Sequence, residues 1–196
     1  MKKLLLIALA LLMSAETFAD NGQINLKIGA QLLSFYHFNN EEFQIGTTED
    51  KYTKSKNAIS IGTEYLRVLS PVTKIGAGIQ YAFERNLYAN KDNSHKISNM
   101  PIYAIIQINP LKNFKQIHFL FTIGADIFFF RKYGENPVIP FGSLYNGIGI
   151  GYEFPCGLFA QTLYNVSFIN HKNDEDKDYI DIYDEFVFNI GYKFKI

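Results

Sequence analysis

The stretch "EFVFNIGYKFKI", Glu185 to Ile196, decides the fold, because its side chains alternate in character to the last residue. The bulky residues share one parity: Phe186, Phe188, Ile190, Tyr192, Phe194 and Ile196. The opposite parity is mostly small or polar, with Asn189, Gly191, Lys193 and Lys195. Successive side chains of a strand point to opposite faces. The stretch therefore predicts a β-strand with one strongly apolar face.

The first residues predict a targeting signal that is not part of the folded domain. A basic start, Met1-Lys2-Lys3, precedes the apolar run "LLLIALALLM", and Thr17 and Ala19 suit a signal-peptidase cut before Asp20. The run is too short for a membrane helix, which needs about 20 residues. No cysteine stands at the cut, which argues against a lipoprotein. No later apolar run is long enough for a membrane helix, which argues against a helical membrane protein. We expect a signal peptide over 1–19 and one domain over 20–196.

Composition narrows the class of protein. Apolar residues make up 47% of the 196-residue chain and aromatic residues 16%, so much apolar surface must be covered. The formal net charge is zero, which argues against a nucleic-acid binder. The single cysteine, Cys156, excludes an internal disulfide and stands in a proline-glycine turn with no assigned role.

The alternation of the last segment recurs along the chain. Eight such segments cover 22–38, 58–69, 73–84, 100–109, 117–129, 144–154, 158–168 and 182–196. Three connections are short and contain proline, "SPV", "NPLKNFKQ" and "PCG", and the four between them are longer and polar. Long connections alternating with short ones indicate an antiparallel meander with one end in the periplasm and the other outside the cell.

The two parities distinguish a membrane barrel from a soluble one, whose apolar face points inward. Glycines gather on the polar parity, and eight strands leave an interior just wide enough for side chains. We therefore expect the bulky parity on lipid and the other parity in the lumen. The charged residues expected inside are Lys27, Glu64, Lys74, Glu84, Asp126, Glu153 and Lys193. Those expected near the membrane interface are Arg67, Arg85 and Arg131, with a girdle of Tyr36, Tyr65, Tyr81, Tyr152 and Tyr192.

On these features the chain resembles the small eight-stranded outer-membrane barrels of the OmpA/OmpX type, over essentially 22–196. The end, Gly191-Tyr192-Lys193-Phe194-Lys195-Ile196, fits the terminal pattern of that group, although the group usually ends in Phe. The resemblance implies an all-β, eight-stranded antiparallel up-and-down transmembrane barrel in the cell outer membrane. It also implies that the last strand is read by the outer-membrane assembly machinery and closes against the first, which leaves no open edge in the bilayer.

Three candidate sites were weighed, and none yields an assigned catalytic, cofactor-binding or metal-ligating residue. Asp174, Asp176, Asp178 and Glu185 have the spacing of a calcium loop, but Tyr179 stands where glycine is needed. A solvated acidic loop near lipopolysaccharide and its divalent ions is the alternative.

The two histidine candidates concern catalysis. His37 in "YHFNN" faintly resembles the motif of the lipid A deacylases but lacks the serine nucleophile. His118 is expected to face inward, about 26 Å along the strand from Asp126, which is too far for direct pairing.

The favoured function is non-enzymatic: a structural or surface-interaction protein with four extracellular loops. Expected contacts are outer-membrane lipid, lipopolysaccharide and an unknown extracellular partner, with no nucleic acid and no cofactor. A narrow channel or transporter for small or hydrophobic solutes is the first alternative, although a lumen filled by salt bridges is favoured over a pore. A lipid A-modifying barrel enzyme is the second.

Overall fold

The computed structural model describes residues 22–37, 52–86, 96–110, 116–131 and 143–172, and then 178–196. The strands in these ranges are β1 (Gly22–His37), β2 (Tyr52–Lys54), β3 (Ala58–Ser70), β4 (Thr73–Asn86), β5 (Lys96–Ile108), β6 (Ile117–Arg131), β7 (Ser143–Glu153), β8 (Leu158–Lys172) and β9 (Asp178–Lys195). No helix within the described ranges is long and apolar enough to cross a membrane.

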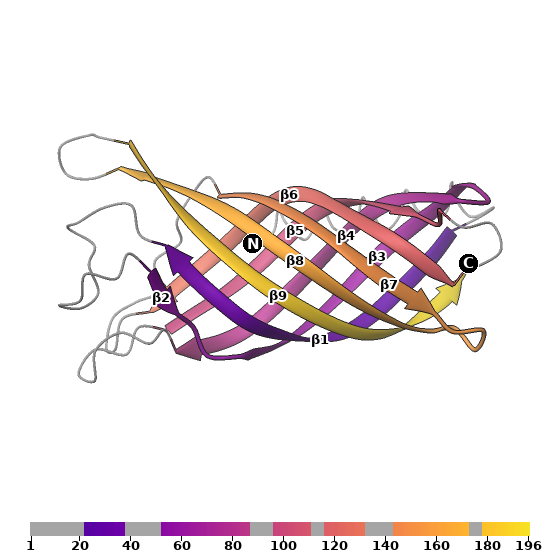
Figure 1. Cartoon of the computed structure of the whole chain (residues 1–196), viewed down its shortest axis with the longest axis horizontal. Coiled ribbons are helices and arrows are strands. Elements are labelled where there is room, and N and C mark those ends of the chain that lie inside the picture. The colour runs from indigo at the N-terminus through magenta and orange to yellow at the C-terminus, as the bar shows by residue number, and fades with distance from the viewer. Residues whose placement is uncertain (1–21, 38–51, 87–95, 111–115, 132–142, 173–177) are drawn as a thin grey trace, which may run out of the picture.

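The sheet closes on itself as an antiparallel barrel. From β3 to β9 each strand pairs with the next along the chain, and β1 pairs with both β3 and β9. The closing seam runs from Gln23 opposite Lys195 to His37 opposite Ile182. Tilted strands wrap around one axis, with the short turns and the C-terminus together at one end (Figure 1). The predicted eight-stranded up-and-down barrel is confirmed.

The barrel wall is apolar outside and polar inside, as the parities predict. Ile28 is 64% exposed and Phe188 43%, whereas Glu64 is 1% exposed and Asn189 is fully buried. An open belt of isoleucine, leucine and phenylalanine would be unfavourable in water, but hydrocarbon solvates it. The interior takes the polar groups because it is closed off from lipid.

Two irregularities in the ladder reverse the parity locally and overturn three expectations. Leu33 has a left-handed φ of 51°, and the β1–β9 register shifts between Leu32 and Phe35. An extra residue in one strand turns the following side chains to the other face. Tyr36 is therefore buried in the lumen beside Ser34, and the expectation that it joins the interfacial girdle was wrong.

The second irregularity lies on β4, where the register with β5 shifts between Ala82 and Arg85. Glu84, expected in the lumen, points outward and pairs with Lys96 at 2.9 Å. Arg85, expected at the interface, is 4% exposed and lies inside. Arg67 is exposed near the end of β3, as predicted, while the side chain of Arg131 lies outside the described set.

The strand bounds differ from the predicted ones mainly at the end of the long connections. β5 begins at Lys96 rather than at residue 100, and β9 begins at Asp178 rather than at residue 182. β2 was not predicted; it extends the β1 edge by pairing Tyr52 with His37 and Lys54 with Phe35. These extensions could not be predicted from alternation, because a strand that continues beyond the lipid-facing belt has polar residues on both faces.

Several glycines of the barrel wall lie so close to neighbouring atoms that a Cβ would collide with them. Two of these glycines allow a matched test. A Cβ on Gly124 would meet the backbone of β5, including the Cα of Tyr103 at 2.6 Å. A Cβ on Gly147 would meet the side-chain ends of Asn165 and Thr122, which can rotate away. We expect Gly124→Ala to lower the free energy of unfolding by about 1–3 kcal/mol, and Gly147→Ala by clearly less. Urea unfolding in micelles measures both, and equal losses would contradict the close backbone approach.

Candidate functional site: the lumen and its two ends

The middle of the lumen holds a buried ion pair. The Nζ of Lys27 on β1 lies 2.5 Å from an oxygen of Glu64 on β3, and each side chain is 1% exposed. The hydroxyl of Tyr103 donates to the same carboxylate at 2.9 Å, and Asn25 donates to the other oxygen at 3.2 Å. Charges removed from water need such partners, because their desolvation is otherwise uncompensated. The arrangement locks β1, β3 and β5 together across the interior.

Apolar side chains form two clusters across the lumen, one toward each end. The first, here the inner cluster, contains Leu66, Tyr103, Ile105, Leu120, Tyr145 and Leu163. The second, here the outer cluster, lies toward the long connections and contains Tyr36, Ile97, Phe128, Ile169 and Tyr183. All eleven of these side chains are at most 4% exposed, and Leu66, Ile97, Leu120 and Phe128 are fully buried. The clusters add apolar packing to an interior whose other buried side chains are mostly polar.

A polar network lies against the outer cluster. The guanidinium of Arg85 donates to Asn99 at 3.2 Å and to the hydroxyl of Tyr183, and forms an ion pair with Glu185 at 3.6 Å. Tyr183 in turn donates to Glu185 at 3.0 Å. Asp126 accepts from Asn99 at 2.9 Å and from Ser167 at 3.0 Å. Side chains from five strands thus meet around Arg85 and Asp126.

The periplasmic end carries a second charged cluster. Glu153, the last residue of β7, accepts from Lys74 at 2.7 Å and from Lys193, so one carboxylate serves two ammonium groups. Gln107 donates to it at 2.9 Å. All three charged side chains are about 15% exposed, which places them at the mouth rather than in the centre.

The structure places six of the seven predicted lumenal charges inside, and Glu84 is the exception. The sequence interpretation missed Arg85 and Glu185, which were assigned to the interface and to a calcium loop. It also missed the large apolar members of the lumen. A signal for these was present, because Leu66 and Leu120 stand on the glycine-bearing parity of their strands and Leu163 stands on the polar parity of β8.

The structure places the two histidine candidates on opposite faces of the wall. Nε2 of His37 lies 3.7 Å from Asp184, to which Tyr164 donates at 2.9 Å, on the outer face of the wall. Ser34, the serine nearest in sequence, is buried on the lumen side. His118 faces inward as predicted, and Asp126 bonds Asn99 and Ser167 instead.

The acidic calcium-loop candidate is not assembled by the described residues. Glu185 lies inside the barrel with Arg85, seven residues into β9, and Asp178 is the first residue of that strand. Asp174 and Asp176 fall outside the described ranges. Within those ranges, no group of three or more His, Cys, Asp or Glu side chains is placed to hold a metal ion.

No family model and no curated protein matches the sequence. The Neisserial surface protein A, NspA, matches over 89% of this chain and 100% of its own, with 11% identity and a TM-score of 0.57. Ail, the attachment invasion locus protein of Yersinia pestis, matches over 89% and 99% with 13% identity and a TM-score of 0.53. A second Ail structure, in complex with the heparin analogue sucrose octasulfate, matches equally well.

At these identities the likeness concerns the fold. It agrees with the closed antiparallel sheet and its β1–β9 seam. The chain therefore has the fold of the small eight-stranded outer-membrane β-barrels of the OmpA/OmpX type, and it is an outer-membrane protein.

Proposed function

We propose that this protein is a non-enzymatic surface barrel, in which a closed wall displays four extracellular connections to a partner outside the cell. The observation that carries the proposal is the filled lumen. Two apolar clusters and a buried ion pair occupy the interior, so the barrel itself offers a solute no continuous polar path. What remains available to the environment is the end formed by the long connections.

The charge of these connections indicates the chemistry of the partner. The segments 38–51, 87–95, 132–142 and 173–177 contain nine carboxylates and four lysines, and the residues beside them add Lys54, Lys56, Lys96, Arg131 and Lys172 against Asp178. The charge of this end is thus nearly balanced, and its densest acidic run is Asp174-Glu175-Asp176. The carboxylates are Glu41, Glu42, Glu49, Asp50, Asp92, Glu135, Asp174, Glu175 and Asp176. A structure of Ail contains a sulfated heparin analogue, but the run Asp174-Glu175-Asp176 would repel such a polyanion. We infer that this run binds a basic surface instead.

A binding experiment with two opposite polymers tests this inference. Micelle-folded protein is passed over immobilised poly-L-lysine and over immobilised heparin. We expect retention on poly-L-lysine that weakens with salt, and none on heparin. Neutralising Asp174, Glu175 and Asp176 to their amides is expected to weaken retention roughly tenfold, at about 0.5 kcal/mol per charge.

The matched control neutralises Lys112 and Lys115, which stand between β5 and β6 in the sequence. This change is expected to leave retention unaltered, because β5 ends and β6 begins at the end of the barrel opposite the ends of β8 and β9 that flank the acidic run. Retention of the unmodified protein on heparin would contradict the proposed partner chemistry. The enzyme alternative is tested separately: lipid A from cells with and without the gene should have identical acyl chains by mass spectrometry.

A further inference from the structure

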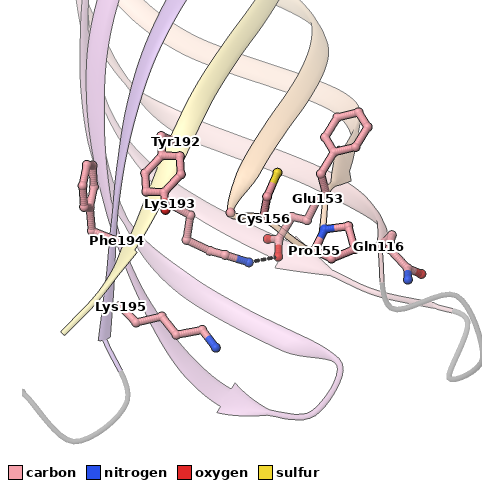
Figure 2. A pocket seen from close by; sticks show the side chains of 10 residues that line it. Gln116, Glu153, Pro155, Cys156, Tyr192, Lys193, Phe194 and Lys195 are labelled. Atoms are coloured by element: carbon pink, nitrogen blue, oxygen red, sulfur yellow. Dashed lines mark hydrogen bonds and ion pairs between the residues drawn. The ribbon is translucent and has the colours of Figure 1, made fainter.

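A hollow opens at the periplasmic end, between the β7–β8 turn and the last residues of β9 (Figure 2). It has a volume of about 540 Å³. One wall is the turn Phe154-Pro155-Cys156-Gly157, and the other is the end of β9 from Tyr192 to Lys195. Gly157, with φ of 91°, allows the tight turn, and its carbonyl accepts from the backbone N–H of Lys193 at 2.9 Å. Both walls are therefore fixed to each other.

The charge inside the hollow is not balanced. Glu153 is the acidic residue among those that line it, and both its oxygens are already used by Lys74, Lys193 and Gln107. Lys195 lies on the same side of β9 as Lys193, and no carboxylate of the described residues lies within ion-pair distance of it. The two ammonium groups that line the hollow thus face one carboxylate, which Lys74 also neutralises from outside the lining. An anion entering the hollow would meet donors without displacing an existing acceptor.

The rim of the hollow places it at the level of lipid headgroups. Tyr192 and Phe194 alternate with the two lysines and point to the opposite side of β9 (Figure 2). They are 42% and 45% exposed, and their rings meet edge to face at 4.8 Å. Tyr152 and Phe154 make the same kind of pair across the hollow, also at 4.8 Å. Aromatic rings mark the membrane–water interface of a barrel, so the hollow lies at the level of the inner-leaflet headgroups, with the lysines on the lumen side of β9 and the rings on its lipid side.

We propose that this hollow binds a phosphate group, and that its occupant is the headgroup of an anionic phospholipid of the inner leaflet. Lys193 and Lys195 contact the phosphate oxygens, and the side-chain amide of Gln116 supplies a further donor from the opposite lining. The acyl chains pass around the end of β9 and continue along the outer wall past Tyr192 and Phe194. A freely diffusing phosphate offers the same oxygens but gains nothing from the aromatic rim.

Lipid retention on the purified barrel tests the proposal. The protein is folded in zwitterionic micelles containing a small fraction of phosphatidylglycerol, and bound lipid is counted by native mass spectrometry. We expect Lys195→Gln to lower phosphatidylglycerol retention about fivefold, the effect of one basic side chain near a lipid surface. Lys195→Glu is expected to lower it further. Glu153→Gln is expected to raise it, because the lysines then face no carboxylate, an increase that mere loss of structure would not produce.

The matched control is Lys96→Gln, which removes an ammonium group of comparable exposure from the far end of the barrel. Each variant is first verified as folded by its heat-modifiable mobility on gels. Inorganic phosphate is titrated as a second arm. Retention equal in the unmodified protein, Lys195→Gln and Lys195→Glu would overturn the site. Displacement of the lipid by millimolar phosphate would overturn the assignment to a headgroup, since the rim would then contribute nothing.

Discussion

Replacing Lys27 with methionine is expected to lower the free energy of unfolding by about 3–5 kcal/mol. The change leaves the carboxylate of Glu64 buried, 1% exposed, with only Asn25 and Tyr103 as donors. The loss of the ammonium group removes the charge that offset the desolvation of Glu64. Urea unfolding of the folded barrel in micelles or thin bilayers measures the effect as a lower midpoint at an unchanged slope.

The control is the double variant Lys27→Met with Glu64→Leu. Replacing both members of a buried pair with apolar residues is often neutral or stabilising, so we expect this variant to regain most of the lost stability. Lys96→Met, at an exposed pair with Glu84, is expected to change stability by at most about 1 kcal/mol. A Lys27→Met loss no larger than that of Lys96→Met would mean that the pair is hydrated and that the lumen is open to water.

How far the sequence predicts this barrel follows from its periodicity. Alternation from Phe186 to Ile196 assigns each side chain to lipid or lumen, because a strand repeats every two residues. That rule fails only where the backbone departs from it. The departures at Leu33 and between Ala82 and Arg85 change the face of Tyr36, Glu84 and Arg85. A single extra residue in a β-ladder is hard to recognise in one sequence. The polar Ser34, on an otherwise apolar parity, was the one sign of the irregularity at Leu33.

The partners inside the lumen are harder to predict than the faces. Lys27 and Glu64 were both expected inside, but their pairing depends on the register between β1 and β3, in which Lys27 stands opposite Gly62. Arg85 and Glu185 are 100 residues apart in sequence and meet across the interior. Register and tilt decide such contacts, and both arise from the closed sheet rather than from any one segment. The sequence therefore predicts which side chains lie in the lumen better than it predicts which of them form hydrogen bonds and ion pairs with each other.

Truncating one side chain in each apolar cluster is expected to make a barrel that conducts no ions into one that conducts them. The unmodified protein should give no current steps in planar bilayers, because the inner and outer clusters each close the interior. Leu120→Ala with Phe128→Ala removes one fully buried side chain from each cluster on the same strand, β6. We expect discrete steps from this double variant, and none from either single variant, since one cluster suffices to close the lumen.

The matched control comes from the opposite face of the same strand. Phe121 and Ile123 are 43% and 57% exposed to lipid, so Phe121→Ala with Ile123→Ala should remain silent. The lumenal truncations remove buried contacts and each cost about 2–5 kcal/mol, so only protein with heat-modifiable mobility enters the bilayer measurement. Steps from the unmodified protein would contradict the closed lumen on which the proposed surface role rests. They would favour the channel alternative instead, since its solutes would then have a path past Leu120 and Phe128.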